Sequence, residues 1–103
     1  PFRRGPLTIL PCAATPWLRL PIIGTSLSTA PAPLFDHFVS SLSAMPFVGL
    51  EFHAVDLLEL AGDGLPKALA AQKDLHVPLA RKWERFRYLL KHLTRTHNPF
   101  VPE

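Results

Sequence analysis

His53 is the residue of this chain best placed to do chemistry, because two carboxylates lie within three positions of it. Glu51 precedes it by two residues and Asp56 follows it by three. An imidazole can take up and release a proton near neutral pH, so it can deliver a proton to a leaving group. A carboxylate beside the ring can orient it. The pattern predicts a catalytic His53 supported by Glu51 and Asp56, although a structural or surface histidine flanked by acids looks the same.

The element expected to position His53 is a strand over 47–55, FVGLEFHAV, which is rich in Phe and Val and follows Pro46. Alternation along a strand places His53 and Glu51 on one face, about 7 Å apart. His53 then lies near the carboxyl end, where parallel α/β folds gather their catalytic groups. A carboxylate inside an apolar strand needs a partner. The candidates for Glu51 are Arg19, His53 or water on a solvated face.

Apolar residues at helical spacing predict two main helices, one over 33–45 and a more amphipathic one over 79–95. The first is expected to bury Leu34, Phe38, Leu42 and Met45. The second is expected to bury Leu79, Trp83, Phe86, Leu90 and Leu93. A helix followed by a strand with two partly apolar faces suits a parallel βαβ unit.

Prolines divide the rest of the chain, 12 of them in 103 residues, and no helix of ordinary length can run through residues 1–33. The predicted segments are an edge strand over 7–14, an extended piece over 17–23, a loop over 24–33, a turn over 61–64, a short helix over 66–72, an extended piece over 74–77 and a last short strand over 100–101.

Composition excludes several classes of site. The single cysteine, Cys12, cannot form an intramolecular disulfide or a cysteine-based zinc cluster. The other histidines lack metal-ligand spacing, and the chain has no phosphate-binding glycine loop and no nucleophile elbow. We expect neither a signal peptide nor a membrane span. The compartment therefore stays unknown, either the cytoplasm or the cell envelope.

The 79–95 helix carries most of the basic residues of a chain with a formal net charge of +3. These are Arg81, Lys82, Arg85, Arg87, Lys91, His92 and Arg95. The alternative function is therefore a non-catalytic interaction module, in which this helix contacts an acidic partner or nucleic acid. Trp83 and Phe86 belong to the predicted apolar stripe and do not interleave with the cations. We therefore expect solvation of this face rather than nucleic-acid binding.

Three pieces of the chain, taken in order, resemble the C-terminal part of the polysaccharide deacetylase (NodB-homology) family. The first is residues 5–11, GPLTILP, and the second is residues 18–27, LRLPIIGTSL. The third is residues 50–56, LEFHAVD, which is similar to the last motif of the family, a strand that ends in His with an acid three places on. A final basic helix follows in that family too, and the likeness runs over most of residues 5–96.

The resemblance implies an α/β fold, the C-terminal portion of a distorted (β/α) barrel whose strands alternate with two main helices. Residues 1–103 would form a single partial domain. It also implies a hydrolase that removes N- or O-acetyl groups from an acetylated sugar, with a divalent, zinc-like metal activating water. By the same likeness His53 is the general acid. Either Leu50 or Phe52 would help to form the pocket for the acetyl methyl group.

Two departures from the family pattern limit these implications. The metal ligands and the catalytic base belong to family motifs that are not present here, so we expect this piece alone to be inactive. A hydrophobic residue is common two places before the histidine, where this chain has Glu51. An incomplete barrel would also expose apolar surface, which a homodimer could cover.

Overall fold

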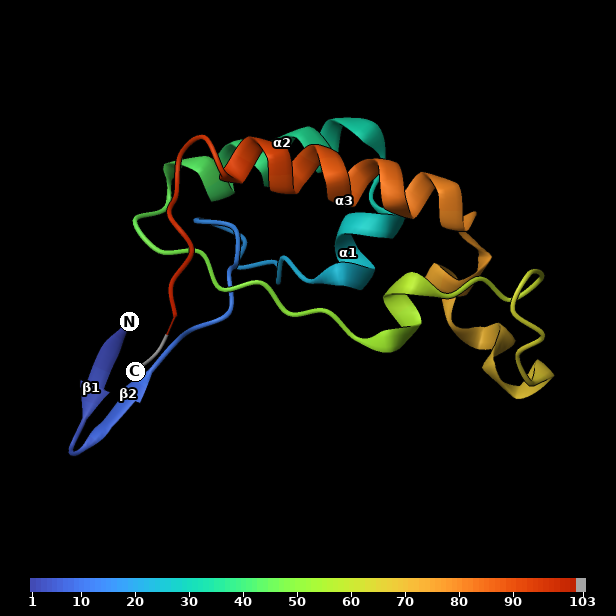
Figure 1. Cartoon of the computed structure of the whole chain (residues 1–103), viewed down its shortest axis with the longest axis horizontal. Helices are drawn as coiled ribbons and strands as arrows, with labels where there is room; N and C mark the ends of the chain where they lie inside the picture. The colour runs from blue at the N-terminus through green and yellow to red at the C-terminus, as the bar shows by residue number, and fades with distance from the viewer. Residues whose placement is uncertain (102–103) are drawn as a thin grey trace.

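The structure is a computed structural model that describes residues 1–101, and within them it contains three α-helices, three short 3₁₀ helices and one antiparallel pair of strands. The α-helices are α1 (Gly24–Thr29), α2 (Ala32–Ala44) and α3 (Leu79–Leu93). The 3₁₀ helices are η1 (Ala54–Leu57), η2 (Lys67–Ala71) and η3 (Lys73–His76), and the strands are β1 (Phe2–Arg4) and β2 (Leu7–Ile9). Figure 1 shows α2 and α3 running side by side above α1, while the hairpin stands apart from the helices.

The expected fold class is therefore wrong: the described residues form a small helical unit with one hairpin, and not a portion of a (β/α) barrel. The strand predicted over 47–55 is wrong: residue 47 lies in a bend, residues 48–53 have no regular secondary structure, and η1 begins at Ala54. The extended segment receives single main-chain hydrogen bonds, from Ala13 to the Gly49 carbonyl at 2.7 Å and from Gly24 to the Glu51 carbonyl at 3.0 Å.

Prolines explain why no sheet forms around this segment. Pro11 lies beside Gly49 and Pro21 lies opposite Ala14 of the neighbouring segment, and proline has no N–H to donate to a ladder. The predicted strand over 7–14 is reduced to β2, and the extended piece over 17–23 contributes only one isolated bridge, between Ala14 and Pro21. β1 and β2 pair with each other through a two-residue turn in which Gly5 has a φ of 62°.

The predicted helix over 33–45 is confirmed as α2, which ends where Met45 turns extended before Pro46. Its inner face packs into the single hydrophobic core together with α1 and α3. The side chains of Phe38 and Leu42 are 2% and 0% exposed. Burying each such side chain stabilises the fold by roughly 1.5–3 kcal/mol.

The predicted helix over 79–95 is confirmed as α3, but its buried face differs from the predicted stripe. Leu89 is 0% exposed, whereas Trp83 and Leu90 are 42% and 51% exposed. Lys82 and Arg85 also face inward, at 0% and 8% exposed. The apolar stripe is predicted on the assumption that the cations of this helix face water. On α3 the side chains of two cations instead turn inward and donate hydrogen bonds to main-chain oxygens.

α1 lies inside the segment predicted to be a loop, so that prediction is wrong. The Ser26 hydroxyl accepts a hydrogen bond from the Ile23 N–H at 3.0 Å, which caps the start of the helix. At its other end Arg85 Nη1 donates to the carbonyls of Leu27 and Ser28, at 2.8 and 3.0 Å. The Ser- and Thr-rich sequence predicts a loop, whereas in the structure Ser26 caps the start of a helix and Arg85, 58 and 57 residues from the two carbonyls, binds its C-terminal part.

The remaining predictions fall on the connection before α3 and on the last described residues. The short helix predicted over 66–72 is present as η2, but the extended piece predicted over 74–77 is largely η3. Residues 100–101 are not in a strand. The ring of Phe100 instead packs edge-on against Phe47, with ring centroids 6.3 Å apart. In the described chain, no helix has both the length and the apolar character needed to cross a membrane.

Adjacent leucines on α3 test the face that the structure buries. We expect Leu89→Ala to lower the free energy of unfolding by about 3 kcal/mol, because it leaves a cavity in the core. Leu90→Ala is the matched control, since Leu90 is 51% exposed, and should change stability by less than about 1 kcal/mol. Chemical denaturation of both variants measures the difference. A larger loss for Leu90→Ala would restore the stripe predicted from the sequence.

Candidate functional site

The candidate site is built on Asp56, whose side chain is 0% exposed. Its Oδ2 accepts a hydrogen bond from the His53 N–H at 2.7 Å, and its Oδ1 accepts one from the Thr25 hydroxyl at 3.1 Å. An acid at the third position of a helical turn commonly accepts the N–H of the capping residue in this way. Asp56 therefore fixes the backbone of His53 and ties η1 to α1.

Close packing against glycine makes room for this carboxylate. A Cβ atom added at Gly24 would overlap Oδ2 and Cγ of Asp56. Gly24 also donates its N–H to the Glu51 carbonyl at 3.0 Å. The glycine thus lets α1 approach both acids of the predicted site.

The imidazole of His53 lies between the two predicted carboxylates, with its side chain 55% exposed. Its Nε2 is 3.3 Å from Glu51 Oε1, and its Nδ1 is 3.8 Å from Asp56 Oδ2. The structure therefore brings together the three polar residues predicted from the sequence. Of the two partners considered for Glu51 it supports His53.

A fourth side chain, Cys12, joins this group although the sequence pattern did not indicate it. Its thiol donates a hydrogen bond to Glu51 Oε2 at 3.4 Å. This hydrogen bond raises the pKa of the Cys12 thiol above its ordinary value, and lost hydration and the negative charge of Glu51 add smaller rises. Cys12 and Glu51 are 39 residues apart, so no local spacing could have revealed the contact.

Leu50 and Phe52 alternate with Glu51 and His53 along the extended segment. Leu50 is half-buried against the hydrophobic core. The ring of Phe52 meets Phe86 of α3 edge-on, with centroids 5.0 Å apart. The alternation expected of a strand thus survives without a sheet, and both apolar side chains pack against the core and α3.

Within residues 1–101 no metal centre surrounds His53. Four pockets at the surface of this part are lined by residues other than His53, Glu51 and Asp56. No three His, Cys, Asp or Glu side chains within it are arranged to hold a metal ion. The chemistry that this geometry supports is proton transfer by an imidazole at an open surface.

Comparison with known proteins adds no relative: no family model, no curated protein and no solved structure matches the chain.

Gly24→Ala tests the close approach of α1 to Asp56. We expect it to lower the free energy of unfolding by about 1–3 kcal/mol, because the new methyl group must displace a buried carboxylate. Gly62→Ala is the control, since its Cβ would meet only Glu59, at an ordinary 3.9 Å. Thermal or chemical unfolding gives both values. Equal stability of the two variants would mean that Asp56 is not held against Gly24.

Alkylation of Cys12 tests its contact with Glu51. Because the hydrogen bond to Glu51 raises the thiol pKa, Glu51→Gln should lower it and increase the thiolate present at a given pH. We expect iodoacetamide to modify Cys12 several-fold faster in this variant at mildly alkaline pH. Glu84→Gln, an exposed acid of α3 that does not contact Cys12, should leave the rate unchanged. An unchanged rate in Glu51→Gln would show that the contact is not formed in solution.

Proposed function

We propose that this chain supplies His53 as the general acid of a carbohydrate deacetylase-like hydrolase, which removes N- or O-acetyl groups from an acetylated sugar. The observation that carries the proposal is the exposed imidazole between Glu51 and Asp56. The substrate class comes from the resemblance of residues 50–56, with the two segments before them, to the deacetylase family.

The step assigned to His53 is protonation of the leaving group. When the tetrahedral intermediate collapses, the bond from the acetyl carbon to the sugar nitrogen or oxygen breaks. The protonated imidazole then gives its proton to that atom and becomes neutral. Asp56 supports this role because it fixes the backbone at His53. Glu51 Oε1, which lies 3.3 Å from Nε2, orients the ring.

The divalent metal implied by the resemblance would activate the attacking water. Residues 1–101 offer no group of three suitable ligands. In this proposal the metal is therefore held by other residues of the protein, and the part of this chain is limited to proton transfer. The acetyl-methyl pocket stays assigned to Leu50 or Phe52.

The alternative, an interaction module with a basic helix, receives less support from the structure. It needs one continuous exposed stripe of cations on α3. Lys82 donates to the carbonyls of Val55 and Leu58, at 3.3 and 2.7 Å, and is fully buried. Arg85 is also buried, so two of the basic residues that this alternative needs at the surface of α3 are not exposed.

Acetate release tests the proposed function in the full-length protein that carries this chain. It should be measured on a panel of N- and O-acetylated sugars, with and without a divalent metal. We expect metal-dependent release from the parent and a loss of about 100-fold or more in His53→Ala, the usual contribution of a general acid. His37→Ala on α2, which also removes an exposed histidine, should keep the parental rate.

Two results would contradict the proposal. Parental kcat/KM in His53→Ala would remove the general-acid role. No acetate release from a well-folded parent on any sugar of the panel would remove the deacetylase activity itself.

A further inference from the structure

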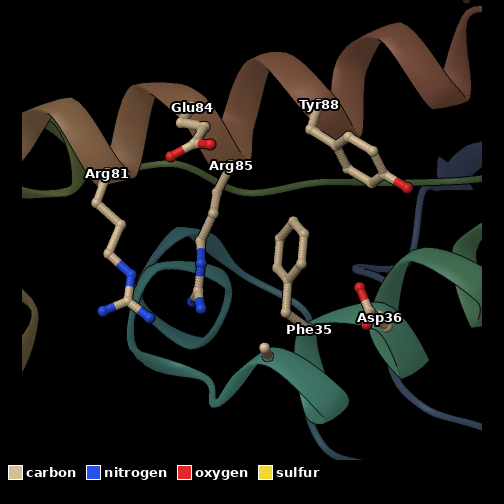
Figure 2. Close-up of a pocket in the computed structure, with 7 residues that line it drawn as sticks. Phe35, Asp36, Arg81, Glu84, Arg85 and Tyr88 are labelled. Atoms are coloured by element: carbon tan, nitrogen blue, oxygen red, sulfur yellow. The ribbon is translucent and has the colours of Figure 1, made fainter.

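A second site lies between α2 and α3, at a pocket of about 400 Å³. Figure 2 shows the side chains that line it, among them the aromatic rings of Phe35 and Tyr88 and the guanidinium groups of Arg81 and Arg85. Both guanidinium groups point the same way from α3. The two rings pack at a tilt with centroids 6.1 Å apart.

Arg85 is held rigidly in this pocket. Its Nη1 donates to the carbonyls of Leu27 and Ser28, at 2.8 and 3.0 Å. Its guanidinium carbon lies 4.9 Å from the centroid of the Phe35 ring, which is a cation–π distance. Three contacts therefore fix the side chain of Arg85. Because its rotamers are already restricted, ligand binding would cost little further side-chain entropy.

Donors of Arg85 are left over after these contacts. Its Nε and Nη2 form no hydrogen bond with any residue of 1–101. They are also not enclosed, because the only sealed side-chain polar atom without a partner in this part is Asp74 Oδ2. Part of their surface is therefore accessible, on a side chain that lines the pocket, and Nε and Nη2 together form a fork able to bind two oxygens.

Arg81 adds a second guanidinium to the same pocket. Neither arginine forms an ion pair with a carboxylate of the described residues. Burial lowers the pKa of Arg85, and the charge of Arg81 lowers it further. Two like charges thus lie side by side at one pocket, with Arg85 partly desolvated and Arg81 exposed, and an anion would relieve their repulsion.

The two acids that line the pocket, Asp36 and Glu84, do not form ion pairs with the two guanidinium groups. Asp36 lies on the far side of the Phe35 ring from the two guanidinium groups, below Tyr88 (Figure 2). Both Asp36 and Glu84 act on Arg85 through space and raise its pKa, without contacting it within ion-pair distance. In formal charge they balance the two arginines of the pocket, which favours a small anion held by directed hydrogen bonds over a polyanion.

We infer that the α2–α3 pocket binds a small ligand through an oxyanion, a phosphate or carboxylate group, that receives hydrogen bonds from Arg81 and Arg85. The rings of Phe35 and Tyr88 pack against the apolar or planar body that carries this group. The site is separate from His53 and does not rest on the proposed hydrolase activity.

Calorimetry on the full-length protein at low ionic strength tests this site, with inorganic phosphate, phenyl phosphate and benzoate as probes. We expect phenyl phosphate to bind tighter than inorganic phosphate, because its ring gains contact with Phe35 and Tyr88. Benzoate measures whether a carboxylate suffices. Arg81→Gln should weaken binding about tenfold, the effect of losing one charge-assisted hydrogen bond.

Arg87→Gln is the matched control, because Arg87 lies on the same helix but its guanidinium lies over the Trp83 ring, 5.7 Å from its centroid. The Arg87→Gln variant should bind each probe with the affinity of the parent protein. Arg85→Lys keeps a cation near α1 but removes the fork, and it should also weaken binding. Equal loss in Arg81→Gln and Arg87→Gln, or no binding of any probe to the parent, would overturn the inference.

Discussion

A cation buried without a carboxylate must find oxygen atoms elsewhere, and this fold meets that constraint with main-chain carbonyls. Arg85 reaches the last carbonyls of α1, and Lys82 reaches carbonyls at η1. The C-terminal end of a helical turn carries partial negative charge and unpaired oxygens, so a cation stabilises it. α3 thereby holds the two segments on either side of the candidate site, which its apolar contacts alone would not orient.

The site at His53 inherits its geometry from these contacts. Lys82 fixes the carbonyls of Val55 and Leu58 on either side of Asp56, and Asp56 in turn binds the His53 N–H and the Thr25 hydroxyl. The carboxylate of Asp56 is buried and doubly hydrogen-bonded, whereas that of Glu51 is 51% exposed and contacts His53 and Cys12 at the surface. The two acids beside the histidine therefore differ: Asp56 is part of the scaffold, and Glu51 is a surface group.

The inward-facing cations of α3, Lys82 and Arg85, lie next to two regions of different chemistry. On one side the imidazole, two carboxylates and the Cys12 thiol gather at an open surface, which suits proton transfer. On the other side Arg85, held by α1 and stacked on Phe35, contributes to a pocket that presents guanidinium donors beside aromatic rings. Neither region is built on a sheet, so both arrangements form although the expected barrel is absent.

The sequence by itself determined the two long helices, because apolar spacing and the prolines at 46 and 78 are local signals. It also placed Glu51 beside His53, since residues two apart in an extended segment share a face about 7 Å apart, whereas the contact of His53 with Asp56 needs the turn of η1 that begins at Ala54. Only the tertiary structure decided that residues 47–53 stay unpaired, that α1 is helical and that Lys82 and Arg85 face inward. Each of these features depends on residues more than 20 positions away along the chain. These are prolines that lack an N–H to donate, or main-chain carbonyls that accept hydrogen bonds, and the spacing of apolar residues reveals neither.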